Sequence, residues 1–235
     1  MAVKRSDGRA FDEVREMSAK VGVIPNADGS ALFAFGNTIA IAAVYGPRQL
    51  HPQHMQNPLK GYLRVNYDLM SFSVYDRKRP GPSRRSSEIS KVTEWALSPA
   101  IYLEQFPNSV IDVQIYILQA DAGTRTAGIN AASMALAHAG IPMKSLVCSV
   151  AIGKLDQDLI VDLTKEEEDF EEGEGATDFP VAVLANTNEF SLLQMDGKLP
   201  PERLNEVLEL ALKVTPKIFE VQKNALKACV GGKDE

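Results

Sequence analysis

The chain has 235 residues, of which 45% are hydrophobic and 24% are charged, a composition typical of a globular protein rather than a disordered one. Lys and Arg number 25 against 31 Asp and Glu, so the formal net charge is −6. This charge argues against a general basic surface that binds any nucleic acid, but it leaves room for a local basic groove.

The sequence carries few signals for targeting or for oxidation. Residues 1–18 are charged without an apolar run, and no segment reaches 18 apolar residues, so we expect neither a secretion signal nor a membrane span. Cys148 and Cys229 have no neighbouring Cys or His at the spacing of a zinc site or a disulfide framework. We therefore expect no membrane partner and a reducing, cytoplasmic location.

The first part of the chain predicts strands joined by turns. Residues 19–24 and 31–35 are short apolar runs around a set of turn-forming residues, which predicts a hairpin. Residues 38–45 have no polar alternation, as expected of a strand buried on both faces. A long loop with three prolines at 46–61 separates it from an alternating strand at 62–69.

A helix is predicted after a second proline-containing loop at 77–83. Ser86 or Ser87 is a suitable N-cap, and Pro99 should kink or end the helix. The apolar residues at helical spacing are Ile89, Val92, Trp95 and Ala96. We expect this face, with Trp95 on it, to pack into the core.

The same region is strongly basic. Residues 77–91 carry six Lys or Arg side chains against a single acid, Glu88. Arg84 and Arg85, near the start of the predicted helix, can neutralise successive backbone phosphates of a single nucleic-acid strand. Taken alone, a charge run of this kind is more often a solvated loop.

The remaining elements complete a mixed α/β (α+β) fold. The same rules predict strands at 110–119, 146–152 and 159–163, a hairpin at 181–185 and 189–195, and helices at 129–139 and 200–227. Hairpins and long helices, rather than regular strand–helix alternation, characterise the pattern. The two halves share a plan of strands followed by a helix, which is consistent with an old duplication.

A glycine turn joins the strand at 110–119 to the helix that follows. A helix N-terminus offers unpaired N–H groups, Gly123 lets the backbone approach a ligand, and Thr124 and Arg125 add a hydroxyl and a positive side chain. This combination fits an inorganic phosphate. The alternative is that Thr124 or Thr126 caps the helix and that Arg125 meets a surface carboxylate.

Residues 162–178 form an acidic segment with nine acids against one Lys. It includes Asp169, Glu171, Glu172, Glu174 and Asp178. Crowded carboxylates raise one another's pKa, which suits a general acid, or bind Mg²⁺ through their oxygens, although most such carboxylates are simply hydrated. Asp178 stands out because it directly precedes a strand, where the sheet would hold its position.

Six segments occur in the order seen in the RNase PH family. They are RSDGR at 5–9, NADGSA at 26–31, GNT at 36–38, RRSSEIS at 84–90, ADAGTRTA at 120–127 and LQMDG at 193–197. Each is weak alone, but six in order over nearly the whole chain are very specific. The chain resembles this family, and within it the catalytic RNase PH-type subunits of the archaeal exosome.

The resemblance implies a fold and a reaction. The fold would be a single RNase PH domain over residues 1–235, built of two related βα halves of the ribosomal protein S5 domain 2-like type. The reaction would be phosphate-dependent 3′→5′ degradation of RNA, in which inorganic phosphate is a co-substrate, nucleoside diphosphates are released, and the reverse step adds nucleotides to a 3′ end. Mg²⁺ is the expected cofactor.

The resemblance also implies partners and site residues. Partners would be single-stranded RNA, a catalytically silent RNase PH-type paralogue in a heterohexameric ring, and RNA-binding cap subunits. The family's phosphate-binding residues correspond to Gly123, Thr124 and Arg125, its RNA-binding arginines to Arg84 and Arg85, and its late acid or Mg²⁺ ligand to Asp178.

One position departs from the family pattern. The family usually has a second aspartate six residues before the one that matches Asp178, and here that position is Glu172. Asp169 follows the acidic run at 166–168 as it does in relatives, so we assign the second catalytic carboxylate to Asp169, with Glu172 as the alternative.

Two other functions stay open from the sequence. A non-catalytic ring subunit that only binds RNA would have no need of an intact phosphate turn or of Asp178. A homohexameric RNase PH of the bacterial, tRNA-trimming kind would share the chemistry but not the paralogue.

Overall fold

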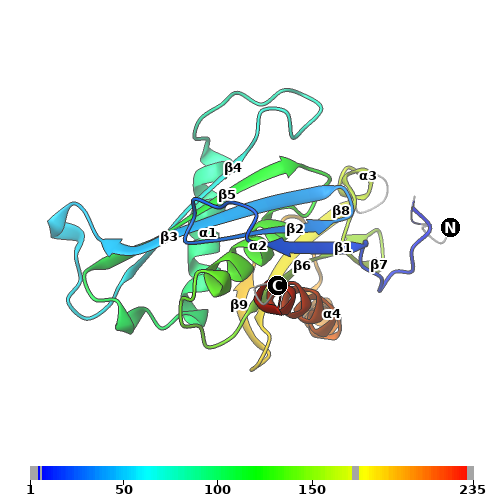
Figure 1. Ribbon diagram of the computed structural model, residues 1–235. Coiled ribbons are helices and arrows are strands. Elements are labelled where there is room, and N and C mark those ends of the chain that lie inside the picture. The colour runs from blue at the N-terminus through cyan, green and yellow to red at the C-terminus, as the bar shows by residue number, and fades with distance from the viewer. Residues whose placement is uncertain (1–4, 6, 171–174, 232–235) are drawn as a thin grey trace.

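The computed structural model describes residue 5 and residues 7–170 and 175–231 (Figure 1). The fold is mixed α+β, as predicted, and its strands form two sheets. The first sheet has the order β1-β2-β3-β5-β4, with β1 (Met17–Val21), β2 (Gly29–Phe35), β3 (Thr38–Gln49), β4 (Tyr62–Leu69) and β5 (Ser109–Gln119). The second has the order β7-β6-β8-β9, with β6 (Val147–Leu155), β7 (Asp158–Val161), β8 (Ala176–Leu184) and β9 (Glu189–Leu193).

Four α-helices accompany the sheets within the described residues. They are α1 (Arg84–Leu97), α2 (Thr124–His138), α3 (Lys165–Glu168) and α4 (Leu204–Gly231). Short 3₁₀ turns lie at Gln53–Met55, Ser98–Ala100, Leu103–Gln105 and Pro201–Arg203. Strands β4 and β5 pair directly in parallel, and α1 lies in the connection between them. The other strand pairs are antiparallel.

Helix α2 lies between the two sheets. It contacts β2, β3 and β5 of the first sheet and β6 and β8 of the second. Almost all of its residues are buried, and most are small, so the helix has no polar face and the sheets approach it closely. At Gly29 the approach is so close that an added Cβ would lie 2.3 Å from the carbonyl oxygen of Ala135.

One hydrophobic core includes buried side chains from both sheets and from α1, α2 and α4. Helix α4 covers the outer side of this assembly, where it packs on β1 and β6 (Figure 1). The prediction of a single domain of two related halves stays a prediction.

Helix α1 corrects two predictions. Its N-cap is Ser83, not Ser86 or Ser87: the Ser83 hydroxyl accepts a hydrogen bond of 3.0 Å from the Ser86 N–H, and Ser86 bonds back to Ser83 in a capping box. Arg84 and Arg85 therefore belong to the first turn of the helix.

Trp95 is not a core residue, since it is 60% exposed, with the Lys91 ammonium 5.5 Å from its ring. The face that α1 buries instead includes Ile89, Thr93, Ala96 and Leu97. These positions follow the helical repeat from Ile89, whereas position 95 lies on the opposite side.

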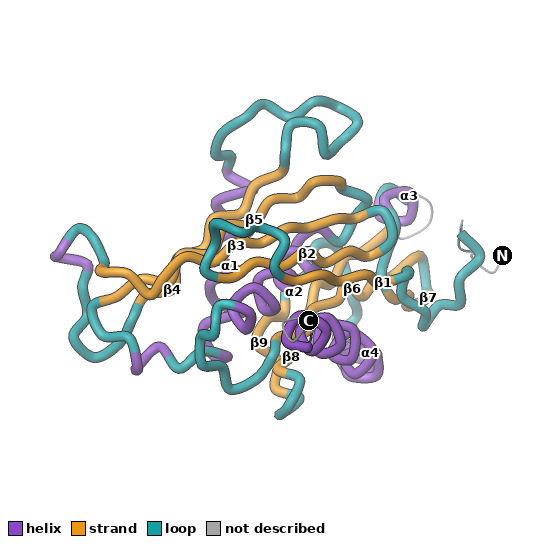
Figure 2. The backbone as a smooth tube through the Cα atoms, in the orientation of Figure 1, coloured by secondary structure: helices purple, strands orange, loops and turns teal. Residues whose placement is uncertain are grey.

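The other predicted elements are confirmed with shifted bounds. The strand at 62–69 coincides with β4, and the predicted hairpins correspond to β1–β2 and β8–β9. Strand β3 continues past Pro47 to Gln49 through a bulge, so the loop is shorter than predicted, and α2 begins at Thr124 rather than at 129. Figure 2 shows the connection between β4 and α1 as a long loop at the top of the view. In the part of the chain that the structure describes, no helix is long and apolar enough to cross a membrane.

Candidate active site

The turn before α2 has the geometry of an anion site. Ala122 and Gly123 both have left-handed backbone conformations, with φ of 52° and 60°. Gly123 is the N-cap of α2, and among the described residues no side chain caps this helix. The Thr126 hydroxyl donates a 2.8 Å hydrogen bond to the Gly123 carbonyl, so it does not occupy the free N–H groups. The α2 N-terminus thus keeps unpaired donors and a favourable dipole for an anion.

A cavity of about 550 Å³ lies in front of this turn. Five of the sequence-predicted site residues line it: Arg85 from α1, Gly123, Thr124 and Arg125 from the start of α2, and Asp178 from β8. Arg85 and the turn belong to the half of the chain that forms the first sheet, and Asp178 belongs to the half that forms the second sheet. These residues therefore meet only in the folded state. The cavity is also lined by Lys165 and Glu168 of α3 and by residues of the β4–α1 loop.

Asp178 is held firmly at the cavity wall. Its backbone N–H and C=O exchange hydrogen bonds of 2.9 and 2.8 Å with Asp196. Its Oδ1 atom is buried without a hydrogen-bond partner in the described part of the chain. Burial, and then the negative charge of Glu168, raise the pKa of Asp178 to about 6, while Arg125 opposes the increase. A carboxyl group with this pKa can exchange a proton near neutral pH.

Arg125 has a defined environment at the cavity edge. Its Nη2 atom forms an ion pair with a Glu88 oxygen of α1 at 3.6 Å, so Arg125 does meet a carboxylate, as the alternative expected, but at a distance too long for a hydrogen bond. The other Glu88 oxygen accepts a 2.7 Å hydrogen bond from the side-chain amide of Gln194, just past β9. The donors of Arg125 therefore stay available to a ligand in the cavity.

Two predicted residues, Arg84 and Asp169, are not brought into the cavity. Arg84 is exposed in the first turn of α1 and does not line the cavity. Asp169 is 62% exposed, and one of its oxygens accepts a 2.6 Å hydrogen bond from the Lys165 ammonium. Glu172 lies outside the described residues.

Sequence reasoning missed Glu168 and Lys165 as cavity residues. Thr164 caps α3, and Glu167 completes a capping box with it. The pattern Thr-x-x-Glu is visible in the sequence and predicts a helical turn at this point. Such a turn directs successive side chains to different sides, so it separates Glu168, at the cavity, from Asp169, at the surface.

Comparisons with known proteins agree with this architecture. Residues 13–142 match the 3′ exoribonuclease family, domain 1 (RNase PH), and residues 145–214 match domain 2 of that family. The chain is 52% identical over 224 residues to the exosome complex component Rrp41 of Thermococcus kodakarensis, covering 95% of this chain and 88% of that protein. Rrp41 of Pyrococcus furiosus is 51% identical over the same shares of both chains.

Solved structures share the fold. Rice (Oryza sativa) Rrp46 superposes with a TM-score of 0.84 at 25% identity, covering 95% of this chain and 100% of that one. A chain of the Archaeoglobus fulgidus exosome with RNA bound to the active site superposes with a TM-score of 0.79 at 24% identity, covering 92% of each chain, and this match shows the fold alone.

Proposed function

Because the chain belongs to the 3′ exoribonuclease (RNase PH) family, we propose that it is the catalytic subunit of an exosome and shortens RNA from the 3′ end with inorganic phosphate as the attacking group. The observation that carries this proposal is the convergence of Arg85, the Gly123–Arg125 turn and Asp178 on one cavity. The relatives at about 50% identity are exosome components, and the match to this chain covers most of their length.

Two different parts of the cavity lining would bind the two anions of the reaction. The α2 N-terminus with Arg125 would hold the attacking phosphate, since helix dipole, free N–H groups and a guanidinium all favour a dianion. Arg85 would hold the last phosphodiester of the RNA from the other side. Two anions that repel each other in water are thereby held in line, which lowers the barrier of phosphoryl transfer.

An oxygen of inorganic phosphate forms a bond to the phosphorus of the last phosphodiester, and the bond from that phosphorus to the preceding 3′ oxygen breaks. The terminal nucleotide leaves as a nucleoside diphosphate. The 3′ oxygen takes a proton, which Asp178 would supply as general acid and take back in the reverse reaction.

The cavity offers few side chains that could bind Mg²⁺. Among the described residues, no group of three or more His, Cys, Asp or Glu could hold a metal ion. Glu168 and Asp178 both line the cavity, however, and Mg²⁺ is often held by one or two carboxylates together with substrate phosphates and water. We propose Glu168 as the protein's ligand, which leaves Asp178 free to act as the general acid; the bound ion would neutralise charge on the phosphates.

The exosome relatives support RNA and RNase PH-type neighbours as partners. We propose more specifically a hexameric ring with a catalytically silent paralogue, single-stranded RNA as substrate, RNA-binding cap subunits, and a cytoplasmic location.

The decisive test uses the chain assembled with its RNase PH-type partner. Single-stranded RNA should be degraded to nucleoside diphosphates in phosphate buffer, and Arg125→Ala should suppress this strongly. Arg203→Ala, which removes an arginine paired with Glu206 beside α4, is the matched control and should keep the activity. Release of nucleoside monophosphates at an equal rate without phosphate would refute the proposal.

A further inference from the structure

Two turns with left-handed residues lie next to each other, one from each half of the chain, and the first of them lines the active-site cavity. Ala122 and Gly123 form the first, before α2. Asp162, just past β7, forms the second, with a φ of 56° and a side chain that is 1% exposed. A left-handed conformation at a residue other than Gly is strained and persists only where its surroundings fix it.

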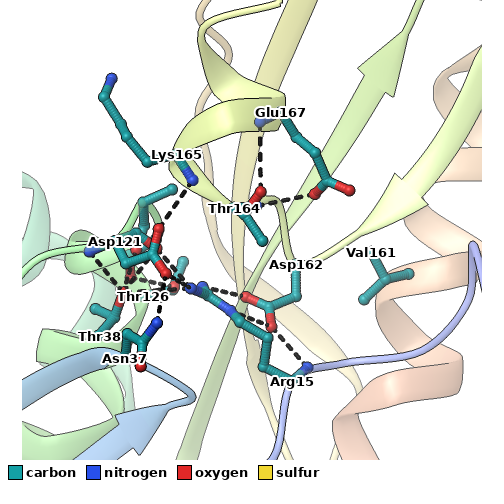
Figure 3. Close-up of polar contacts among 12 residues, drawn as sticks. Arg15, Asn37, Thr38, Asp121, Thr126, Val161, Asp162, Thr164, Lys165 and Glu167 are labelled. Atoms are coloured by element: carbon teal, nitrogen blue, oxygen red, sulfur yellow. Dashed lines mark hydrogen bonds and ion pairs between the residues drawn. The ribbon is translucent and has the colours of Figure 1, made fainter. Parts of the chain in front are cut away.

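One buried side chain, Arg15, joins these turns (Figure 3). Its backbone N–H and its Nε donate to Asp162 Oδ2 at 2.8 and 2.9 Å, and its Nη2 donates to Oδ1 at 2.7 Å. Its Nη1 donates to the backbone carbonyl of Asp121, the residue before Ala122. The guanidinium therefore binds the carboxylate of one turn and the backbone of the other at the same time.

Arg15 also lies directly behind the phosphate-binding turn. A Cβ added at Gly123 would be 3.3 Å from Arg15 Nη2 and 3.8 Å from Asp162 Oδ1. The Thr38 hydroxyl lies 2.8 Å from the Asp121 carbonyl and 2.7 Å from the Ala122 carbonyl, and it accepts a hydrogen bond from the Asp121 N–H. The turn is thus fixed from the side opposite to the cavity.

The same contacts reach the acidic segment. Asp121 Oδ1 accepts a 3.1 Å hydrogen bond from the backbone N–H of Lys165, the first residue of α3 (Figure 3). Helix α3 carries Glu168 to the cavity. Displacing Arg15 would therefore shift the phosphate turn relative to the carboxylates.

Arg15 stays charged in this position. Burial by itself would lower the pKa of Arg15, but the hydrogen bonds and charge of Asp162 outweigh burial, and the net pKa is raised. Because the Asp162 carboxylate balances the charge of Arg15, the guanidinium acts on the turn through its position and its hydrogen bonds.

We propose that Arg15 is a positioning residue for inorganic phosphate, which holds the Gly123 turn in its binding conformation and sets it against the carboxylates of the second half. The proposal rests on the proposed function. It assigns a role to the N-terminal segment, of which neither residue 5 nor residues 7–16 line the cavity.

The chain offers a matched control in Arg5. The Arg5 side chain is fully buried, and its guanidinium bonds both oxygens of Glu167 at 2.8 and 3.0 Å and the backbone carbonyls of Val161 and Asp162. Arg5 belongs to the same buried cluster as Arg15 but makes no hydrogen bond to Asp121 or to the α2 turn. Its replacement measures the effect of losing a buried guanidinium that contacts α3 and the Asp162 backbone but not the phosphate turn.

The experiment compares Arg15→Lys and Arg5→Lys in the assembled enzyme. For each we would measure the melting temperature, the KM for phosphate, and the Kd for a non-cleaved single-stranded RNA without phosphate. Arg15→Lys should raise the phosphate KM about tenfold or more and change the RNA Kd less than about twofold, because a displacement of the turn affects the phosphate alone. Arg5→Lys should lower the melting temperature without raising the phosphate KM.

A phosphate KM within twofold of wild type in folded Arg15→Lys, or an equal rise in Arg5→Lys, would overturn the proposal. If Arg15→Lys does not fold, Thr38→Val decides instead: it keeps the Arg15–Asp162 pair and the volume of the side chain but removes the hydroxyl behind the turn. Thr38→Val should then raise the phosphate KM, and an unchanged value would overturn the proposal. Failure of the proposed function itself would appear differently, as a wild-type enzyme that releases no nucleoside diphosphate.

Discussion

The amide of Gln194 donates a 2.7 Å hydrogen bond to Glu88, from 106 positions away in the chain, and so holds this carboxylate 3.6 Å from Arg125. Without that restraint Glu88 could close on Arg125 and compete with a bound phosphate. Both residues belong to motifs that the sequence singled out without assigning them a role.

Gln194→Leu should therefore weaken phosphate binding. Coupling within such a network is on the order of 1 kcal/mol, so the phosphate KM should rise about fivefold. In a Glu88→Gln background, where no charge competes for Arg125, the same Gln194→Leu change should have little further effect. A double-mutant cycle on the phosphate KM measures this, and two additive effects would contradict the interpretation.

The raised pKa of Asp178 predicts opposite pH dependences for the two directions. As a general acid, Asp178 must be protonated for phosphorolysis, so the rate should fall as pH rises above about 6. The reverse reaction needs the ionised form and should rise through the same range. Since Glu168 contributes to the increase in pKa, Glu168→Gln should move both limbs to lower pH.

The ionisation of phosphate itself is the same in wild type and in Glu168→Gln. A shift between their two pH profiles therefore reports on a titrating group of the enzyme, which we expect to be Asp178. Profiles that coincide in wild type and Glu168→Gln would show that another group titrates.

The same pKa has a consequence for stability. The folded-state pKa of about 6 lies above the unfolded value of 3.8, so the folded protein favours the protonated form and loses stability as pH rises from about 4 to 6. Asp178→Asn removes this penalty and should raise the free energy of unfolding by about 2–3 kcal/mol at pH 8. The gain should shrink toward zero below pH 4, which denaturant titrations at several pH values would show.

The sequence predicted the strands well because their signal is local. Apolar alternation marked residues 62–69, and that strand has the predicted bounds. Trp95 was placed wrongly because α1 buries a polar residue, Thr93, within its inner face, so hydrophobicity alone did not identify that face.

Of the site residues, too, those with a local sequence signal were predicted, and those that depend on distant contacts were not. The turn at Gly123 was visible because glycine, hydroxyl and cation stand next to one another. Arg15 was not visible, because its main partner Asp162 lies 147 positions away. Nothing local distinguishes such an arginine from one at the surface, and only the packing of α3 against β8 shows that Glu168, not its neighbour, lines the cavity.

Arg84 and Arg85 should differ in their contribution to RNA binding. Arg85 lines the cavity and would contact the last phosphates, whereas Arg84 lies outside it. Arg85→Gln should reduce the slope of log affinity against log salt by about 0.7 for RNA of any length. Arg84→Gln should change this slope only for RNAs long enough to extend beyond the cavity. Binding titrations with short and long RNAs at several salt concentrations test this, and equal effects of both variants on the short RNA would contradict it.

The second carboxylate is the last point on which sequence and structure make different predictions. The family pattern assigns it to Asp169, but in the structure the Asp169 side chain is exposed and bonded to Lys165, whereas Glu168 lines the cavity and its charge raises the pKa of Asp178. Groups that assist proton transfer or hold a metal at the reacting atoms contribute about 10²- to 10⁴-fold in rate. Glu168→Gln should therefore cost phosphorolysis at least about a hundredfold, and Asp169→Asn should cost only a few-fold.

Glu172→Gln provides the third arm of this comparison. All three variants remove one negative charge from the same segment and keep the length of the side chain, so a general electrostatic effect would be equal among them. Single-turnover rates at saturating phosphate separate the three. If Asp169→Asn instead lost a hundredfold while Glu168→Gln stayed active, the family assignment would hold, and the Asp169 side chain would have to leave Lys165 and enter the cavity when substrate binds.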